Sequence, residues 1–122
     1  MATPAASIGV QWAEMAVSND QLAQRQNLFR DANERIEYAA TVVGHKGLRP
    51  YICECSLDGC VERIEVETEV YEVVRGHSAR FLTLPGHEIA EIEDIVTRRD
   101  AYQVVEKMHT FAEIAAGGNP RR

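Results

Sequence analysis

The sequence predicts an α+β fold in which a long N-terminal helix packs on a small and mainly antiparallel sheet. Two patterns carry this prediction. Apolar residues recur at intervals of seven between residues 22 and 43, as expected for one face of a helix. Beyond residue 48, short alternating segments rich in β-branched residues are separated by turn residues, as expected for antiparallel strands. A helix followed by clustered strands is typical of α+β domains.

The long helix is expected over about residues 20–42. Residues 18–20, Ser-Asn-Asp, can cap its N-terminus, because their side-chain oxygens accept hydrogen bonds from the free amides of the first turn. Gly44 or Gly47 would end it. A narrow apolar stripe would pack inside the protein or form a seam with another helix, and it consists of Leu22, Phe29, Ile36 and Val43.

The remaining elements are short. Strands are predicted at 51–53, 61–66, 81–84, 92–97 and 102–107, the last two joined as a hairpin. Short helices are predicted at 68–75, with Thr68 as its cap, and at 110–116. The strands are expected to share one sheet.

The chain is expected to divide into three parts. Residues 1–17 form a tail with a short apolar segment around Trp12, residues 18–116 form a single α+β domain, and residues 117–122 form a disordered tail. A chain of 122 residues is long enough to bury a core. Its hydrophobic content of 45% and charged content of 26% are ordinary for a globular domain.

A net charge of −6 at pH 7 argues against a partner bound mainly through phosphates, such as nucleic acid. The arginine pairs at 98–99 and 121–122 are interpreted as solvated surface. The N-terminus lacks the basic start and apolar run of a signal peptide, and no apolar stretch has the length of a transmembrane helix. The sequence therefore predicts a cytoplasmic protein that does not insert into a membrane.

Three cysteines, Cys53, Cys55 and Cys60, fall within eight residues. In a reducing compartment such a cluster favours metal or redox chemistry over a disulfide framework. Three thiolates and one imidazole form a complete tetrahedral ligand set for zinc. The turn residues at 56–59 would let the cysteines face one ion. We therefore predict one structural Zn²⁺ site.

The fourth ligand is predicted to be His87. This histidine follows Pro85-Gly86, a tight turn that can aim its side chain and approach the cysteines closely. His77, which follows Gly76, is the alternative. Three other interpretations of the cysteines stay open, namely core thiols, redox groups and a catalytic metal site. A site of this composition also admits iron, although geometry and ligand softness favour zinc.

The cysteine cluster belongs to a longer pattern over about residues 27–107. This pattern resembles a group of small, uncharacterised, cysteine-containing bacterial proteins that is common in actinobacteria. The resemblance implies that the cysteines and the Pro-Gly-His-Glu turn form one recurring zinc-binding unit, which supports His87 as a ligand. The segments that carry it are NERI at 33–36, YICECSLDGC at 51–60, VERIE at 61–65, YEVVR at 71–75, RFL at 80–82, PGHE at 85–88 and VVEK at 104–107.

These observations predict a non-catalytic, zinc-stabilised module for protein interaction or regulation. The partner would be another protein, or a second copy of the chain, bound through helix 20–42. One alternative is a thiol-based sensor that responds to oxidation by releasing zinc. A less favoured alternative is a small metal-dependent hydrolase with water as the fourth ligand.

Overall fold

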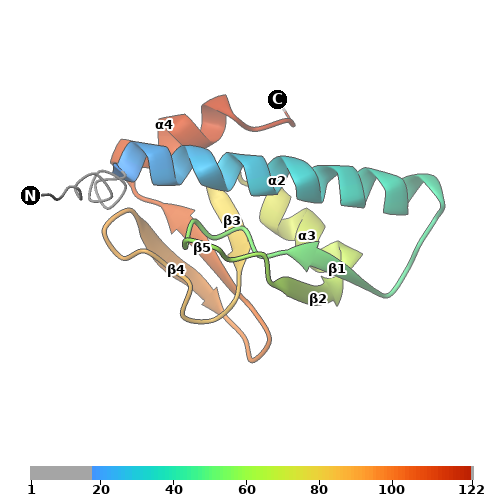
Figure 1. Ribbon diagram of the computed structural model, residues 1–122. Helices are drawn as coiled ribbons and strands as arrows, with labels where there is room; N and C mark the ends of the chain where they lie inside the picture. The colour runs from blue at the N-terminus through green and yellow to red at the C-terminus, as the bar shows by residue number, and fades with distance from the viewer. Residues whose placement is uncertain (1–17, 122) are drawn as a thin grey trace, which may run out of the picture.

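A computed structural model describes residues 18–121, and it confirms the α+β fold. The described strands form a three-stranded sheet and a two-stranded ribbon. Figure 1 shows helix α2 (Asn19–Val42) running along the molecule, with the larger sheet beneath its N-terminal half and the ribbon beneath its C-terminal half. The segment around Trp12 lies outside the described residues. In chain order the elements are α2 (Asn19–Val42), β1 (Leu48–Ile52), β2 (Arg63–Glu67), α3 (Thr68–Arg75), β3 (Arg80–Thr83), β4 (Glu93–Arg98), β5 (Gln103–Lys107) and α4 (His109–Gly117).

The described strands form two antiparallel sheets rather than one. β1 pairs with β2, with Tyr51 opposite Ile64. β5 lies between β3 and β4, and the predicted hairpin is the β4–β5 pair. The strands themselves could be predicted from the sequence, because the alternation of apolar and polar residues is a local pattern. It does not predict the division into two sheets, because a strand's own pattern does not name its partner.

The ends of α2 follow the predicted cap chemistry. The Ser18 hydroxyl accepts from the Gln21 amide at 3.1 Å, and the Gln21 side chain accepts from the Ser18 amide at 2.9 Å. This reciprocal pair is a capping box. The helix ends before Gly44, whose φ of 68° lies in the left-handed region. The predicted cap of α3 is wrong, because Glu67 occupies the N-cap position and Thr68 begins the helix.

The face of α2 that is buried is mainly polar, and the predicted apolar stripe does not form the centre of the interface. The stripe residues Leu22, Phe29 and Ile36 lie half-buried beside this face, and Val43 is exposed. A periodic apolar pattern could not reveal a helix that docks through hydrogen-bonding side chains. The buried residues are Ala23, Gln26, Arg30, Asn33, Glu37 and Ala40.

Arg30 is the largest buried side chain on this face. Its guanidinium donates to the carbonyls of Ser78 at 2.7 Å and Ala115 at 2.5 Å, and it lies 4.6 Å from the ring centre of Phe81. Burial lowers the pKa of Arg30 to about 10. The side chain therefore stays charged, and it ties α2 to the segment before β3 and to α4.

Asn33 closes the outer edge of β1. Its side-chain amide donates to the Ile52 carbonyl and its oxygen accepts from the Ile52 amide, both at 2.7 Å. Two residues earlier, Pro50 has no amide hydrogen to offer. The edge of the β1–β2 ribbon is therefore occupied by a helix side chain, which opposes pairing with a further strand.

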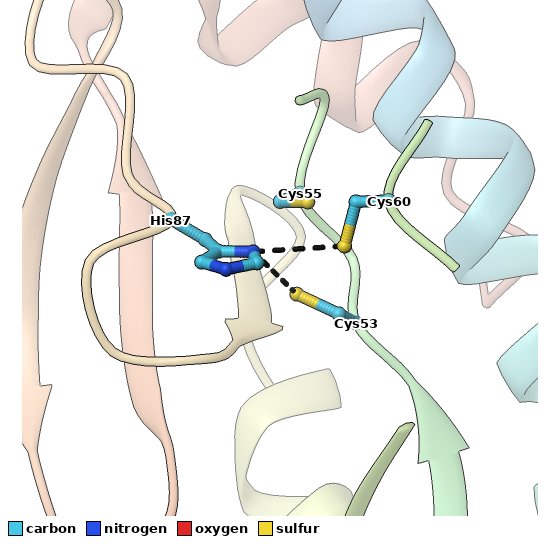
Figure 2. A group of neighbouring side chains, drawn as sticks. All are labelled: Cys53, Cys55, Cys60 and His87. Atoms are coloured by element: carbon cyan, nitrogen blue, oxygen red, sulfur yellow. Dashed lines mark hydrogen bonds between the residues drawn. The ribbon is translucent and has the colours of Figure 1, made fainter. Parts of the chain in front are cut away.

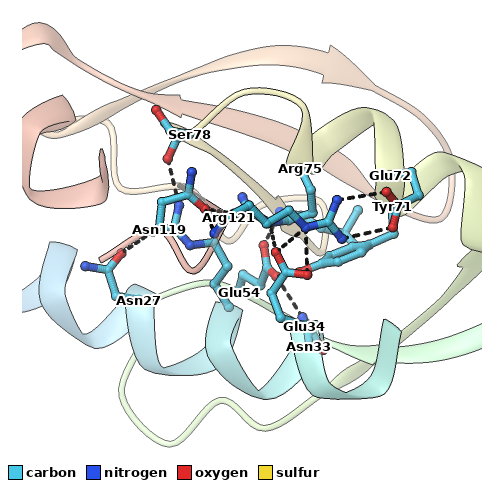
Figure 3. Close-up of polar contacts among 12 residues, drawn as sticks. Asn27, Asn33, Glu34, Glu54, Tyr71, Glu72, Arg75, Ser78, Asn119 and Arg121 are labelled. Carbon is cyan, nitrogen blue, oxygen red and sulfur yellow. Dashed lines mark hydrogen bonds and ion pairs between the residues drawn. The ribbon is translucent and has the colours of Figure 1, made fainter. Parts of the chain in front are cut away.

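The segment after α4 returns to α2 and α3 (Figure 3). Asn119 is buried and its side-chain oxygen accepts from Arg75, which also pairs with Glu34 at 2.7 Å. Arg121 binds the carboxylates of both Glu34 and Glu72. The division of the chain at residues 17 and 116 stays a prediction, although Asn119 and Arg121 contact the folded part.

A pair of carboxyl groups, Glu37 on α2 and Glu72 on α3, lies beside Arg121. The Tyr51 hydroxyl donates to Glu37 at 2.5 Å. Burial, together with the hydrogen bond to Glu72, raises the pKa of Glu37 to about 7. The hydrogen bond from Arg121 lowers the pKa of Glu72 to about 2. At a pH between these two pKa values, the two carboxyl groups together hold one proton.

We expect this pair to make the protein less stable as the pH rises from about 5 to 8. Folded Glu37 binds its proton more tightly than an unfolded glutamate, whose pKa is 4.5, so stability present at low pH is lost as the pH rises through 7. Glu37→Gln mimics the protonated form and should make the protein more stable than the wild type at pH 8, by about 1–2 kcal/mol. Urea unfolding at pH 5 and pH 8 measures the difference, with exposed Glu65→Gln as the control. An unchanged pH dependence in Glu37→Gln would contradict the assignment.

Candidate metal centre

The four predicted ligands come together in the structure and are called here the Cys3His cluster: Cys53, Cys55, Cys60 and His87. The cysteines lie between β1 and β2, and His87 lies in the loop between β3 and β4. Figure 2 shows the imidazole turned toward the sulfur atoms. Nδ1 of His87 lies 3.6 Å from Sγ of Cys53 and 3.6 Å from Sγ of Cys60. All four ligand atoms lie within 4.8 Å of one another, so the cluster could hold one metal ion.

These separations match tetrahedral coordination. Zinc binds sulfur at about 2.3 Å and nitrogen at about 2.0–2.1 Å, so tetrahedral angles place a sulfur and a nitrogen ligand about 3.6 Å apart. The separations of His87 Nδ1 from the sulfurs of Cys53 and Cys60 have this value. Little rearrangement would therefore be needed for an ion to bind between the imidazole and the thiols.

The local backbone explains why the side chains converge. Cys53 and Cys55 are two residues apart in the segment that continues from β1, and both sulfurs belong to the cluster. Two sharp turns complete the cluster, one at Gly59 with φ of 75° and one at Gly86 with φ of 85°. Only glycine adopts this left-handed conformation without strain. Gly86 directly precedes His87, as the sequence analysis predicts for a turn that aims the imidazole.

Each sulfur also receives a backbone hydrogen bond. The Leu84 amide donates to Cys53 Sγ at 3.2 Å. The other two sulfurs accept from the backbone amide two residues further along the chain: Cys55 from Leu57, and Cys60 from Glu62. Hydrogen bonds from amides stabilise thiolates and orient them around a metal. The surroundings of the cluster thus favour negative sulfur atoms.

The three thiols do not ionise independently. A hydrogen bond from Cys53 lowers the pKa of Cys55 to about 5, and the same bond is the main reason that the pKa of Cys53 is raised. Burial raises the pKa of Cys60. The protein groups alone therefore favour one thiolate beside two thiols, because neighbouring negative charges repel. A divalent cation would favour three thiolates by supplying the opposite charge.

Glu54 lies between two of the cysteines in the sequence, and its side chain lies among residues of α2 and α3 (Figure 3). It is fully buried. Its carboxylate accepts from the Tyr71 hydroxyl at 2.7 Å, the Asn33 amide group at 2.9 Å and the Leu82 backbone amide at 2.9 Å. Burial raises its pKa, and these hydrogen bonds oppose that shift. Glu54 therefore anchors the cysteine segment to α2, α3 and β3.

Sequence reasoning did not identify Glu54 as an anchor. The available signal was its position, because an acidic residue between two side chains that face a metal site must point to the opposite side. His77, the alternative fourth ligand, lies elsewhere. It is exposed, its Nδ1 accepts from the Ala79 amide at 3.3 Å, and its Nε2 lies 3.9 Å from Glu106.

Comparison of the chain with protein-family models, curated proteins and solved structures found no match. The resemblance to small actinobacterial proteins therefore stays a prediction. Among residues 18–121, no helix combines the length and the apolar character needed to cross a bilayer. The site geometry is what remains as a basis for a functional proposal.

Proposed function

We propose that the chain is a non-catalytic, zinc-stabilised module for interaction or regulation, in which the Cys3His cluster binds one Zn²⁺. The observation that carries this proposal is the convergence of the four ligand atoms within 4.8 Å, with His87 Nδ1 3.6 Å from two of the sulfurs. Three sulfurs with one imidazole is a common ligand set for structural zinc, and soft thiolates disfavour magnesium and calcium. Zinc is preferred to iron on the same grounds of geometry and softness.

The ligand set supports a structural role over a catalytic one. Catalytic zinc sites usually keep one position for water or substrate, whereas four protein ligands fill a tetrahedral ion. The hydrolase alternative would require His87 to leave the ion. Its Nδ1 is instead turned toward two of the sulfurs.

The position of the cluster supports a role in holding the fold together. Its cysteines continue from the β1–β2 ribbon, and its histidine follows a strand of the other sheet. A bound ion would therefore connect the two sheets. Because such a site exists only in the folded chain, metal binding would add directly to folding stability.

The exposed face of α2 is the proposed partner surface, for another cytoplasmic protein or a second copy. Three apolar side chains on this helix are largely exposed, with 68% of Leu28, 72% of Tyr38 and 64% of Val42 accessible. Tyr38 and Val42 are four residues apart and neighbours on the helix surface, while Leu28 lies nearer the N-terminus of α2 and is also away from the buried polar face. Clustered exposed apolar side chains are typical of interaction sites.

Native mass spectrometry of the reduced protein tests both parts of the proposal. We expect one zinc per chain, lost on denaturation, and the same spectrum shows whether the chain is one copy or two. His87→Ala should lose its zinc at a chelator concentration at least about tenfold lower than the wild type requires, because one ligand is gone. His77→Ala is the matched control and should behave as the wild type. Protein without zinc, or equal zinc retention in both variants, would contradict the ligand assignment.

The redox alternative rests on the proximity of three thiols, two of which, Cys53 and Cys55, share a hydrogen bond. It predicts that sub-stoichiometric peroxide expels zinc and forms a disulfide. Cys53 and Cys55 are fully buried, which opposes attack by an oxidant. We therefore expect the zinc-bound mass to persist after mild peroxide, and its loss would favour the sensor.

A further inference from the structure

The outward face of α2 carries a regular row of exposed side chains. Both sheets lie beneath the helix in Figure 1, and this row lies away from the buried polar face. Its members recur at alternating intervals of four and three residues, which is the a/d repeat of a coiled-coil seam. The row is called here the outer seam, and it consists of Gln24, Leu28, Asp31, Arg35, Tyr38 and Val42.

The centre of the outer seam carries one charge of each sign. Asp31 and Arg35 are both exposed, and neither makes an ion pair within residues 18–121, so both charges are available to a partner. Apolar side chains flank them, Leu28 on the N-terminal side and Tyr38 on the C-terminal side. The surface is hollowed beside these charges by a cleft of about 420 Å³ that a side chain from a second helix can enter. Its lining is Asp31, Glu34, Arg35, Tyr38 and Pro120.

The order of the side chains along the outer seam is self-complementary for two antiparallel copies of α2. In an antiparallel seam, each a residue of one helix faces a d residue of the other. With the two-fold axis level with residue 33, Asp31 faces Arg35 of the second copy, and Leu28 faces Tyr38 of the second copy. The axis repeats each of these pairs, as a symmetric dimer requires.

Other alignments of the two helices are opposed by the same charges. A parallel pair would set Asp31 against Asp31 and Arg35 against Arg35 of the second copy, and like charges repel. An antiparallel pair shifted by one heptad would set Asp31 against an apolar residue, either Val42 or Leu28. A carboxylate buried there would have no partner, which is costly. The charges therefore select one orientation and one register.

We propose that α2 binds α2 of a second copy as an antiparallel pair along the outer seam, with Asp31 of each copy facing Arg35 of the other. This inference rests on the partner surface of the proposed function and commits that surface to a second copy. Residues 24–42 span about 27 Å along the helix axis. A seam of this length is a small interface, so we expect a weak dimer with a Kd on the order of 1–100 μM. None of the four predicted metal ligands lies on α2, so pairing leaves them in place.

Sedimentation equilibrium of the full zinc-loaded chain, from about 1 to 500 μM, tests the pairing. We expect a reversible equilibrium between one copy and two. Asp31→Arg and Arg35→Asp should each raise the dimer Kd by at least about tenfold, because each sets like charges face to face. The variant with both substitutions restores opposite charges in the antiparallel register, and its Kd should return to within about threefold of the wild type. In a parallel pair the double variant would stay repulsive, so a failure to recover would overturn the proposal.

Two control variants separate the seam from general charge effects. Glu65→Arg and Arg63→Asp make the same changes of net charge on the exposed face of β2, and each should change the Kd by less than about twofold. A loss as large as that of the seam variants would overturn the proposal.

An NMR measurement on a mixture of differently labelled copies locates the contact. We expect a nuclear Overhauser effect between the Leu28 methyl groups and the Tyr38 ring. Within one copy these residues lie about 15 Å apart along the helix axis, so the signal has to come from two copies. A chain that stays monomeric at about 500 μM would overturn this inference. It would leave the zinc site unaffected, because zinc content is measured separately by mass.

Discussion

Replacing Cys60 by serine is expected to lower the thermal midpoint of the zinc-loaded protein by about 10 °C or more. A hydroxyl is a poor zinc ligand, so the variant would lose most of the folding energy that the ion supplies. Cys60 is the one cysteine of the cluster that is partly exposed. Its substitution should therefore change packing little, and the loss can be assigned to the metal.

Thermal unfolding with and without a zinc chelator measures this effect. In chelator, the wild type and Cys60→Ser should unfold at nearly the same temperature, and in zinc only the wild type should gain stability. Ser56→Ala is the matched control, because its buried hydroxyl lies within the same segment and has no hydrogen-bond partner among the described residues. A Cys60→Ser protein that still gains stability from zinc would show that Cys60 is not a ligand.

Replacing Glu54 by leucine is expected to cost about 3–5 kcal/mol of unfolding free energy. The change leaves three donors without an acceptor, those of Asn33, Tyr71 and the Leu82 amide. Buried donors that lose their acceptor bear the full cost of desolvation. The loss should be present with and without zinc, because the carboxylate faces away from the cluster.

Denaturant unfolding measures the loss, with Glu65→Leu on the exposed face of β2 as a control that should stay within about 0.5 kcal/mol. A double-mutant cycle with Tyr71→Phe identifies the partner. Removing the Tyr71 hydroxyl should cost less in Glu54→Leu than in the wild type, because its acceptor is already gone. Additive losses would contradict a direct hydrogen bond between these side chains.

Structural features that depend on residues close together in the sequence could be predicted. The cap at Ser18, the end of α2 before Gly44 and the β4–β5 hairpin all follow from local backbone chemistry. For the Cys3His cluster, two turns with left-handed glycines direct the side chains, and the need of three thiolates for a fourth ligand, a matter of metal chemistry, predicted that His87 joins the cysteines.

Features that depend on distant partners could not be predicted. Arg30 is an ordinary solvent-facing residue by its type, and only Ser78 and Ala115, which come from other elements, explain its burial. Glu54 likewise depends on donors from three elements. Hydrophobic periodicity identifies an apolar face, and it gives no weight to charged side chains whose partners lie far away in the chain.

The polar face of α2 has a mechanical consequence. A helix docked through apolar side chains loses less stability when it shifts along its axis, because hydrophobic contacts are not directional. For α2 a slide of one turn, about 5.4 Å, would part Arg30 from its carbonyl acceptors and Asn33 from the edge of β1. Each displaced polar group would be buried without a hydrogen-bond partner, so a shifted helix would lose the stabilisation of all these contacts at once. The helix can therefore pack on the two sheets in one register only, and this register fixes the position of each sheet along the helix axis.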